Sequence, residues 1–205
     1  MTRLTTLAAF AIALICTSVP VLAQDGRHAY VQGVSGFGIS TGSMMGIAVG
    51  VDVAPSVRIG GEVGHLADLT PTPVRAQFND PDLAALGAKV TPQSPALYAL
   101  VSGTYLGQPA RRVHPYVGGG LGFARLTRQL EIMGSSPTAQ MIRDDYAGNS
   151  QSALRVLANV QAGVNVPVHS GIAVNLGYRF TKVFDDSSPA PLTGGGVEAG
   201  LTFGF

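Results

Sequence analysis

The feature that most constrains this fold is a strict alternation of apolar residues with polar or small ones. It is clearest at the end of the chain, in residues 197–205. There every second side chain is apolar, and glutamate, threonine or glycine stands between them. A period of two residues is that of a β-strand with one apolar face, and it excludes a helix over this segment.

The same alternation recurs upstream and predicts eight strands in all. The segments are 30–39, 47–53, 57–64, 97–105, 113–124, 155–166, 172–181 and 197–205. Short connections (54–56, 106–112, 167–171) alternate with long polar ones (67–94, 127–152, 183–193), and only 40–43 is short where a long one is expected. Short periplasmic turns and long external loops are typical of outer-membrane barrels, so we expect both termini in the periplasm.

The composition favours a lipid environment for these strands. Mean hydropathy is +0.29 and charged residues make up only 12% of the chain. Yet no apolar run after residue 23 approaches the roughly 20 residues of a membrane helix. The 27 glycines also disfavour helices. In a soluble sandwich the apolar faces would form a core, whereas in lipid the backbone must close on itself. The sequence therefore predicts an all-β, closed, up-and-down antiparallel transmembrane β-barrel of eight strands.

The N-terminus has the pattern of a secretory signal peptide. Arg3 precedes the apolar stretch 7–16, and the small-residue site Val21-Leu22-Ala23 follows. We expect cleavage after Ala23, leaving 24–205 as the barrel domain. A membrane anchor is the alternative, but the apolar run is short for a span. Lipidation of Cys16 is disfavoured by the bulky Ile15 before it.

Charge and cysteine content exclude several classes of function. The whole chain has 13 Lys and Arg against 12 Asp and Glu, and removal of residues 1–23 takes only Arg3. The mature chain then balances 12 against 12, with no basic excess to suit nucleic acid. Its only cysteine leaves with the signal peptide, so no disulfide or thiolate metal site can form. No metal-ligand spacing appears, and we expect no cofactor.

Three motifs resemble those of a known family. Residues 115–124 (PYVGGGLGFA), 177–180 (GYRF) and 200–205 (GLTFGF) look like the small outer-membrane β-barrel superfamily of Gram-negative bacteria. That family includes the OmpA membrane domain, OmpX/Ail-like proteins and opacity-type, porin-family proteins. The resemblance implies a cell outer-membrane location. It also implies that a terminal aromatic residue, here Phe205, serves as an assembly signal for the barrel assembly machinery.

Six charged side chains are expected to face the lumen and form a polar network. By strand parity they are Asp52, Arg58, Glu62, Arg155, Arg179 and Glu198. They could form an ion path or gate. They could equally form a salt-bridge network that plugs the lumen, because an eight-stranded barrel is just wide enough for side chains to fill. We expect the plug.

Catalysis is the rival class of function, since some eight-stranded barrels modify lipid A. Such enzymes need a nucleophile, a histidine and an acid together. The four histidines, His28, His65, His114 and His169, match no such arrangement in the sequence. We therefore expect a non-enzymatic outer-membrane protein with a structural or surface-interaction role. A narrow porin-like channel for small solutes is the alternative, and the sequence identifies no external ligand.

A basic belt is expected where the strands leave the membrane on the external side. His65, Arg125 and Lys182 continue the outward faces of the third, fifth and seventh strands. They could simply mark where the membrane stops, because the cost of charge facing lipid fades near the interface. The sharper hypothesis is that Arg125 and Lys182 contact phosphates of lipopolysaccharide.

Overall fold

A computed structural model describes most of the chain after its first 27 residues. The described residues are 28–38, 42–78, 89–108, 113–134, 136–146, 151–186, 188 and 190–205. The expected signal peptide, residues 1–23, lies outside them, so cleavage after Ala23 stays a prediction. No helix among the described residues is both long enough and apolar enough to cross a membrane.

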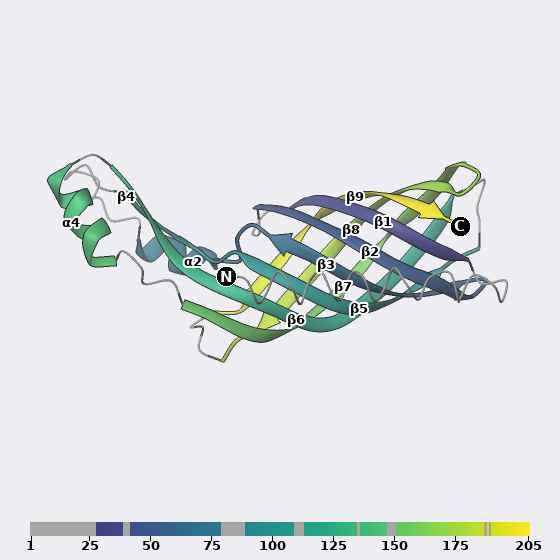
Figure 1. Cartoon of the computed structure of the whole chain (residues 1–205), viewed down its shortest axis with the longest axis horizontal. Coiled ribbons are helices and arrows are strands. Elements are labelled where there is room, and N and C mark those ends of the chain that lie inside the picture. The colour runs from purple at the N-terminus through teal and green to yellow at the C-terminus, as the bar shows by residue number, and fades with distance from the viewer. Residues whose placement is uncertain are drawn as a thin grey trace.

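Eight antiparallel strands form a closed ring, as the alternation predicts (Figure 1). Each strand pairs with the next along the chain, and the first pairs with the last. The ring consists of β1 (Ala29–Gly38), β2 (Gly42–Ala54), β3 (Val57–Leu66), β5 (Ala96–Leu106), β6 (His114–Met133), β7 (Gln151–His169), β8 (Ile172–Phe184) and β9 (Leu192–Gly204). Because the sheet closes, no edge of the ring leaves its backbone unpaired.

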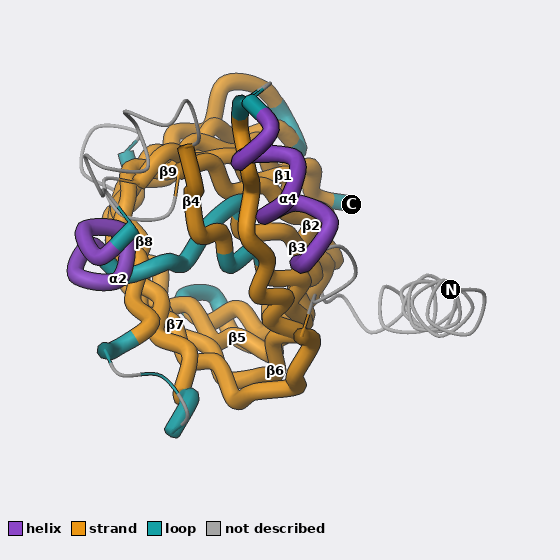
Figure 2. The backbone as a smooth tube through the Cα atoms, turned by 90° about the vertical axis from the view of Figure 1, so that its left-hand side faces the viewer, coloured by secondary structure: helices purple, strands orange, loops and turns teal. Residues whose placement is uncertain are grey.

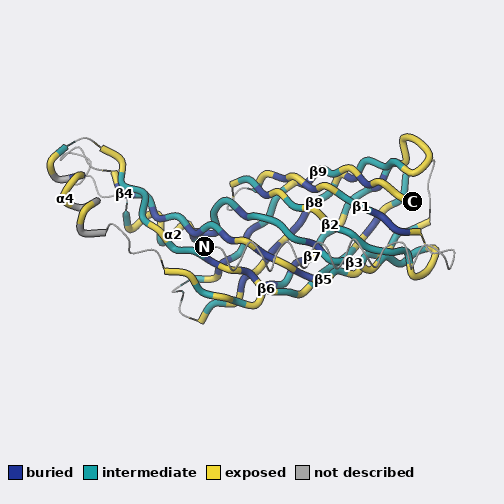
Figure 3. Tube along the Cα trace, in the orientation of Figure 1, coloured by how far each residue is buried: buried dark blue, intermediate teal, exposed yellow. Residues whose placement is uncertain are grey.

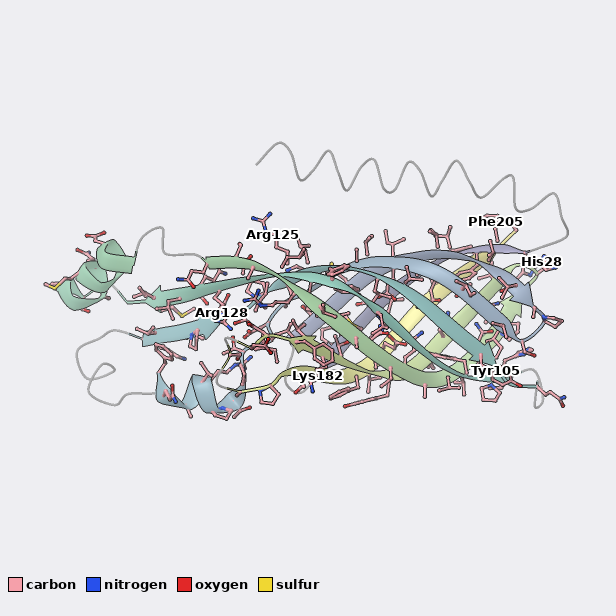
Figure 4. All side chains as sticks on the ribbon, turned by 90° about the horizontal axis from the view of Figure 1, so that it is seen from below. His28, Tyr105, Arg125, Arg128, Lys182 and Phe205 are labelled. Atoms are coloured by element: carbon pink, nitrogen blue, oxygen red, sulfur yellow. The ribbon has the colours of Figure 1, made fainter. Side chains whose placement is uncertain are left out.

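The two ends of the barrel differ. His28 and Phe205 lie together at one end, which we call the terminal end (Figure 4). There the Phe205 N–H donates to the carbonyl oxygen of Ala29 at 2.9 Å and helps to close the ring. The turn between β7 and β8 is also there, and Gly171 takes a φ of 76° that favours glycine. The opposite end, which carries the long connections, we call the loop end.

An extension projects from the loop end beyond the ring (Figures 1 and 2). It contains α2 (Thr72–Gln77), α4 (Pro137–Tyr146) and the short strand β4 (Lys89–Gln93), which pairs with residues 129–133 of β6. The regions 67–94 and 127–152 are thus not loops throughout, as the sequence pattern suggested. Past Ala124 the alternation continues, but the outward positions turn polar. The sequence prediction ended this strand where its outward side chains stop being apolar, which is too early, because β6 continues to Met133.

The outer surface of the ring is apolar, and buried and exposed residues alternate along its strands (Figure 3). Outward side chains with exposures of 42% or more come from every strand of the ring. Examples are Phe37, Ile47, Ile59, Val101, Leu121, Val160, Phe180 and Leu201. An apolar surface of this extent around a barrel is what the hydrocarbon of a bilayer covers.

Inside the barrel, tyrosine rings lie against strand glycines. The Tyr98 hydroxyl would be 2.5 Å from a methyl group built on Gly64, and the Tyr116 hydroxyl would be closer still to one built on Gly177. Gly163 is equally tight, since a methyl there would run into the carbonyl oxygen of Leu176. These glycines give the tyrosines the room that they need to cross the lumen.

This packing predicts that alanine substitutions at two glycines differ in their effect on stability. Gly163→Ala should lower the free energy of unfolding, because its neighbours are backbone atoms that cannot yield. Gly103 also lies in a strand of the ring, but a methyl there meets nothing within 4 Å. Gly103→Ala should leave stability unchanged or raise it by about 0.4–1 kcal/mol. Urea unfolding of both variants in lipid vesicles checks this, and equal losses would contradict the assigned packing.

Candidate functional site

The centre of the lumen is organised by one guanidinium, that of Arg179 on β8. Its Nε donates to Glu198 Oε2 on β9 at 2.8 Å, and its Nη1 donates to Glu62 Oε1 on β3. Its Nη2 donates to Gln161 Oε1 on β7 at 2.7 Å. The charged side chains are each only 3% exposed. The two neighbouring strands β7 and β9, and β3, which is distant in sequence, are therefore joined to β8 by charge-assisted or polar hydrogen bonds.

Two tyrosines complete this cluster, and the sequence analysis did not include them. Tyr98 on β5 donates to Glu62 Oε1 at 2.5 Å, and Tyr116 on β6 donates to Glu198 Oε1 at 3.0 Å. Tyr116 supplies a donor to the Glu198 oxygen that Arg179 does not reach, and Tyr98 adds a second donor to the Glu62 oxygen that Arg179 also binds, so both buried carboxylates accept more than one hydrogen bond. Strand parity could have identified both tyrosines as lumen residues, because both stand at inward positions of their strands. We call Glu62, Tyr98, Tyr116, Gln161, Arg179 and Glu198 the lumen cluster.

Asp52 and Arg58 lie nearer the terminal end and form a separate pair. They are opposite each other across the β2–β3 hairpin, and Arg58 Nε donates to Asp52 Oδ1 at 2.8 Å. The Arg58 guanidinium also lies 5.2 Å from the centre of the Tyr30 ring. The side chains of Arg58 and Asp52 are 20% and 26% exposed, so water reaches this pair more easily than the lumen cluster.

A second polar group, without charge, runs along the inner wall over the adjacent strands β7, β8 and β9. Asn165 Nδ2 donates to Asn175 Oδ1, and Asn175 Nδ2 donates to Thr202 Oγ1, each at 2.6 Å. All three side chains are buried. They satisfy one another without any charge, as buried polar groups must.

Toward the loop end the lumen is filled by apolar side chains, which we call the apolar layer. Each is at most 2% exposed, and most come from different strands of the ring. The layer consists of Leu66, Leu69, Leu126, Leu157, Val183 and Leu192. Leu69 comes from the segment after β3 and packs with the rest. The polar interior is therefore covered at this end by a layer of buried apolar side chains.

Arg155 lies apart from the lumen cluster, although strand parity suggested one network. It faces inward, but six residues along β7 from Gln161, a rise of about 20 Å. Its Nε donates to Asp185 Oδ1 at 2.8 Å, and Arg128 Nη2 donates to Asp185 Oδ2 at 2.6 Å. The Asp185 carboxylate is only 1% exposed. Asp185 lies just after β8, so parity within the strands could not identify it as the partner.

The basic residues of the expected belt all point outward. Strand register places His65 and Arg125 in one row, with Leu97 between them. Lys182 lies on another side of the barrel, and its Nζ is 5.0 Å from the centre of the Phe184 ring (Figure 4). Arg125 has no ion-pair partner within the described ranges. Contact of these residues with lipopolysaccharide stays a prediction, as does the assembly role of Phe205, whose side chain is 67% exposed.

Neither a metal centre nor a catalytic arrangement is found in the part of the chain that the structure describes. No three histidine, cysteine or acidic residues there are grouped to hold a metal ion. None of the four histidine side chains forms a hydrogen bond with another described side chain. A cavity of about 450 Å³ lies in the extension at the loop end.

An eight-stranded ring with an apolar outside and a filled interior defines a small transmembrane β-barrel. A sequence model for the outer membrane protein β-barrel domain matches residues 9–205. The chain belongs to this family, and its location is the cell outer membrane, as the sequence motifs implied. No curated protein matches the sequence significantly.

Solved structures with the same fold agree with this assignment. Neisserial surface protein A, NspA, is 16% identical with a TM-score of 0.57, and the match covers 88% of this chain and 97% of NspA. A major outer membrane protein from Thermus thermophilus is 14% identical with a TM-score of 0.59, covering 87% of this chain and 99% of that one. At these identities the likeness concerns the fold.

The Asp52–Arg58 pair predicts a measurable coupling energy. Arg58→Ala should reduce the free energy of unfolding more in the parent protein than in an Asp52→Ala background. The difference should be about 0.2–1 kcal/mol, the range for cross-strand pairs of opposite charge. The contact with Tyr30 is lost in both backgrounds and cancels in the cycle. Urea unfolding of the four proteins measures the coupling, and a value of zero would refute the pairing.

Proposed function

We propose that this protein is a non-conducting outer-membrane barrel with a structural and surface-interaction role, and that its extension faces the cell exterior. The observation that carries the proposal is the filling of the lumen. The lumen cluster joins β3, β5, β6, β7, β8 and β9 across the interior. The apolar layer covers it toward the loop end. A hydrated ion entering this interior would have to displace satisfied hydrogen bonds and then cross an apolar layer.

Small internal spaces support the same proposal. A cavity bounded by Arg58, Tyr116 and Gln161 at the terminal side measures about 20 Å³, and one beside Arg179 and Met44 about 10 Å³. A single water needs about 10–15 Å³ of such volume. These spaces suit isolated waters and do not form a continuous water-filled path.

The extension supports the surface role. It carries the 450 Å³ cavity and lies at the end of the barrel opposite His28 and Phe205 (Figure 4). In outer-membrane barrels the long connections face outward and the short turns face the periplasm.

Conductance in planar bilayers tests the proposal against the narrow-channel alternative. The purified, heat-modifiable parent protein should give no stable openings, because both the lumen cluster and the apolar layer block the path. A variant with Leu66, Leu126 and Leu157 all changed to serine removes much of the layer and serves as the matched comparison. Reproducible single-channel steps from the parent protein would overturn the non-conducting proposal.

We also propose that Arg125 and Lys182 bind phosphates of lipopolysaccharide in the outer leaflet. Both side chains are exposed on the outward faces of β6 and β8. Changing both to glutamate should reduce the lipopolysaccharide that co-purifies with the folded barrel, because the phosphates lose their cationic partners. Lys89→Glu, on β4 in the extension, is a control that should keep the parent amount. If the double variant retains as much lipopolysaccharide as the parent, the two residues only mark the membrane boundary.

A further inference from the structure

The cavity in the extension is built by segments that are far apart in the sequence. Its walls come from α2 and the residues that flank it, from β4 and Ser94, from residues 128–130 of β6, and from the β8–β9 connection, together with Gln151 of β7 and Leu192 of β9. Its volume of about 450 Å³ lies within the range of small-molecule sites, about 300–1,000 Å³. It lies above the apolar layer, since Leu192 belongs to both. A ligand would therefore reach it from the loop end and not through the lumen.

The charge of the cavity lining is already balanced. Arg128 is the one charged residue among those that form its walls, and its guanidinium donates to Asp185 at 2.6 Å. Nearby Arg75 is likewise bound to Asp68 at 2.6 Å. An anionic ligand would have to compete with these carboxylates for the guanidinium groups. The lining therefore favours a ligand without net charge.

The remaining lining combines amides with apolar surface. Gln77 and Gln151 belong to the lining, and their amides can both donate and accept hydrogen bonds. Gln93 and Gln129 also border the cavity, but their side chains lie on the other face of the β4–β6 pair from Pro92 and Leu130, where Gln129 Nε2 donates to Gln93 Oε1 at 3.4 Å and Gln93 Nε2 donates to the Glu131 carboxylate. The apolar part includes the aromatic ring of Phe78 and the side chain of Leu130.

From this lining we infer a binding site for a neutral saccharide unit. Sugar hydroxyls donate and accept hydrogen bonds as glutamine amides do, and the C–H faces of a sugar ring suit Phe78 and Leu130. A lipid tail fits less well, because it would leave the amides without partners. The inference deepens the proposed surface role and rests on it. The sugar could belong to lipopolysaccharide of the same membrane or to a free glycan.

The absence of tryptophan from the chain allows a direct test. Phe78→Trp places a single fluorophore in the cavity wall. The folded variant in phosphatidylcholine nanodiscs, which present no sugar, is titrated with maltose, cellobiose and N,N′-diacetylchitobiose over the micromolar to millimolar range. At least one disaccharide should change the tryptophan emission saturably, and calorimetry with the unmodified protein should give the same dissociation constant.

Two further variants connect the response to the cavity. Gln151→Leu in the reporter protein should weaken binding about tenfold, because an amide that bonds the ligand is lost. Gln140→Leu removes an exposed glutamine from α4, outside the cavity lining, and should leave binding unchanged. Nanodiscs that contain lipopolysaccharide distinguish the sources: loss of the disaccharide response assigns the site to its sugars, and an unchanged response assigns it to a free glycan.

Three results would overturn the inference in a protein that remains heat-modifiable. They are no saturable response to any of the three disaccharides, a stronger response to octanol or to a neutral tripeptide, and equal weakening by Gln151→Leu and Gln140→Leu. None of them bears on conductance. A barrel that is silent in bilayers but binds no sugar would refute only this inference, whereas a conducting barrel would refute the proposed function.

Discussion

The interior of the barrel depends on the hydrogen bonds of Arg179. Its guanidinium reaches β3, β7 and β9 from β8, and the carboxylates that it binds accept further bonds from β5 and β6. A carboxylate buried without partners is costly, so each member of the lumen cluster depends on the others. The cluster thus lets a narrow barrel hold charge inside while its outside stays apolar.

The need to pair every polar group that is buried away from water, and to fit the side chains that do so, also explains the other structural features. In lipid the backbone must be paired all round, and the pairing of β1 with β9 provides this. Side chains that cross the narrow lumen need room, and glycines such as Gly64 and Gly177 give it to Tyr98 and Tyr116. Beyond the membrane these demands end. Strands β6 and β7 can therefore continue into water and form an extension whose cavity has a polar rim.

Much of the fold follows from the sequence because a period of two residues assigns every strand residue to a face. The alternation in 197–205 and its upstream repeats was sufficient to predict the ring. It missed the end of β6 at Met133, because Arg125, Thr127 and Gln129 break the apolar outward face without breaking the strand. It also missed β4, whose five residues include a proline. The candidate site was less predictable, since parity gives a face but not a partner: Arg155 faces inward, yet its carboxylate comes from Asp185.

The most direct test of this account is the unfolding free energy of variants in the lumen cluster, measured by urea titration in phosphatidylcholine vesicles with circular dichroism. Arg179→Met alone should cost about 3–5 kcal/mol, because it leaves Glu62 and Glu198 buried without their cation. Adding Glu62→Gln and Glu198→Gln should restore a large part of that loss, since no buried charge then remains. Glu62→Gln and Glu198→Gln are also measured singly in the parent protein. If the triple variant is less stable than Arg179→Met by the sum of those two single losses, the charges do not act as a unit, and the account is contradicted.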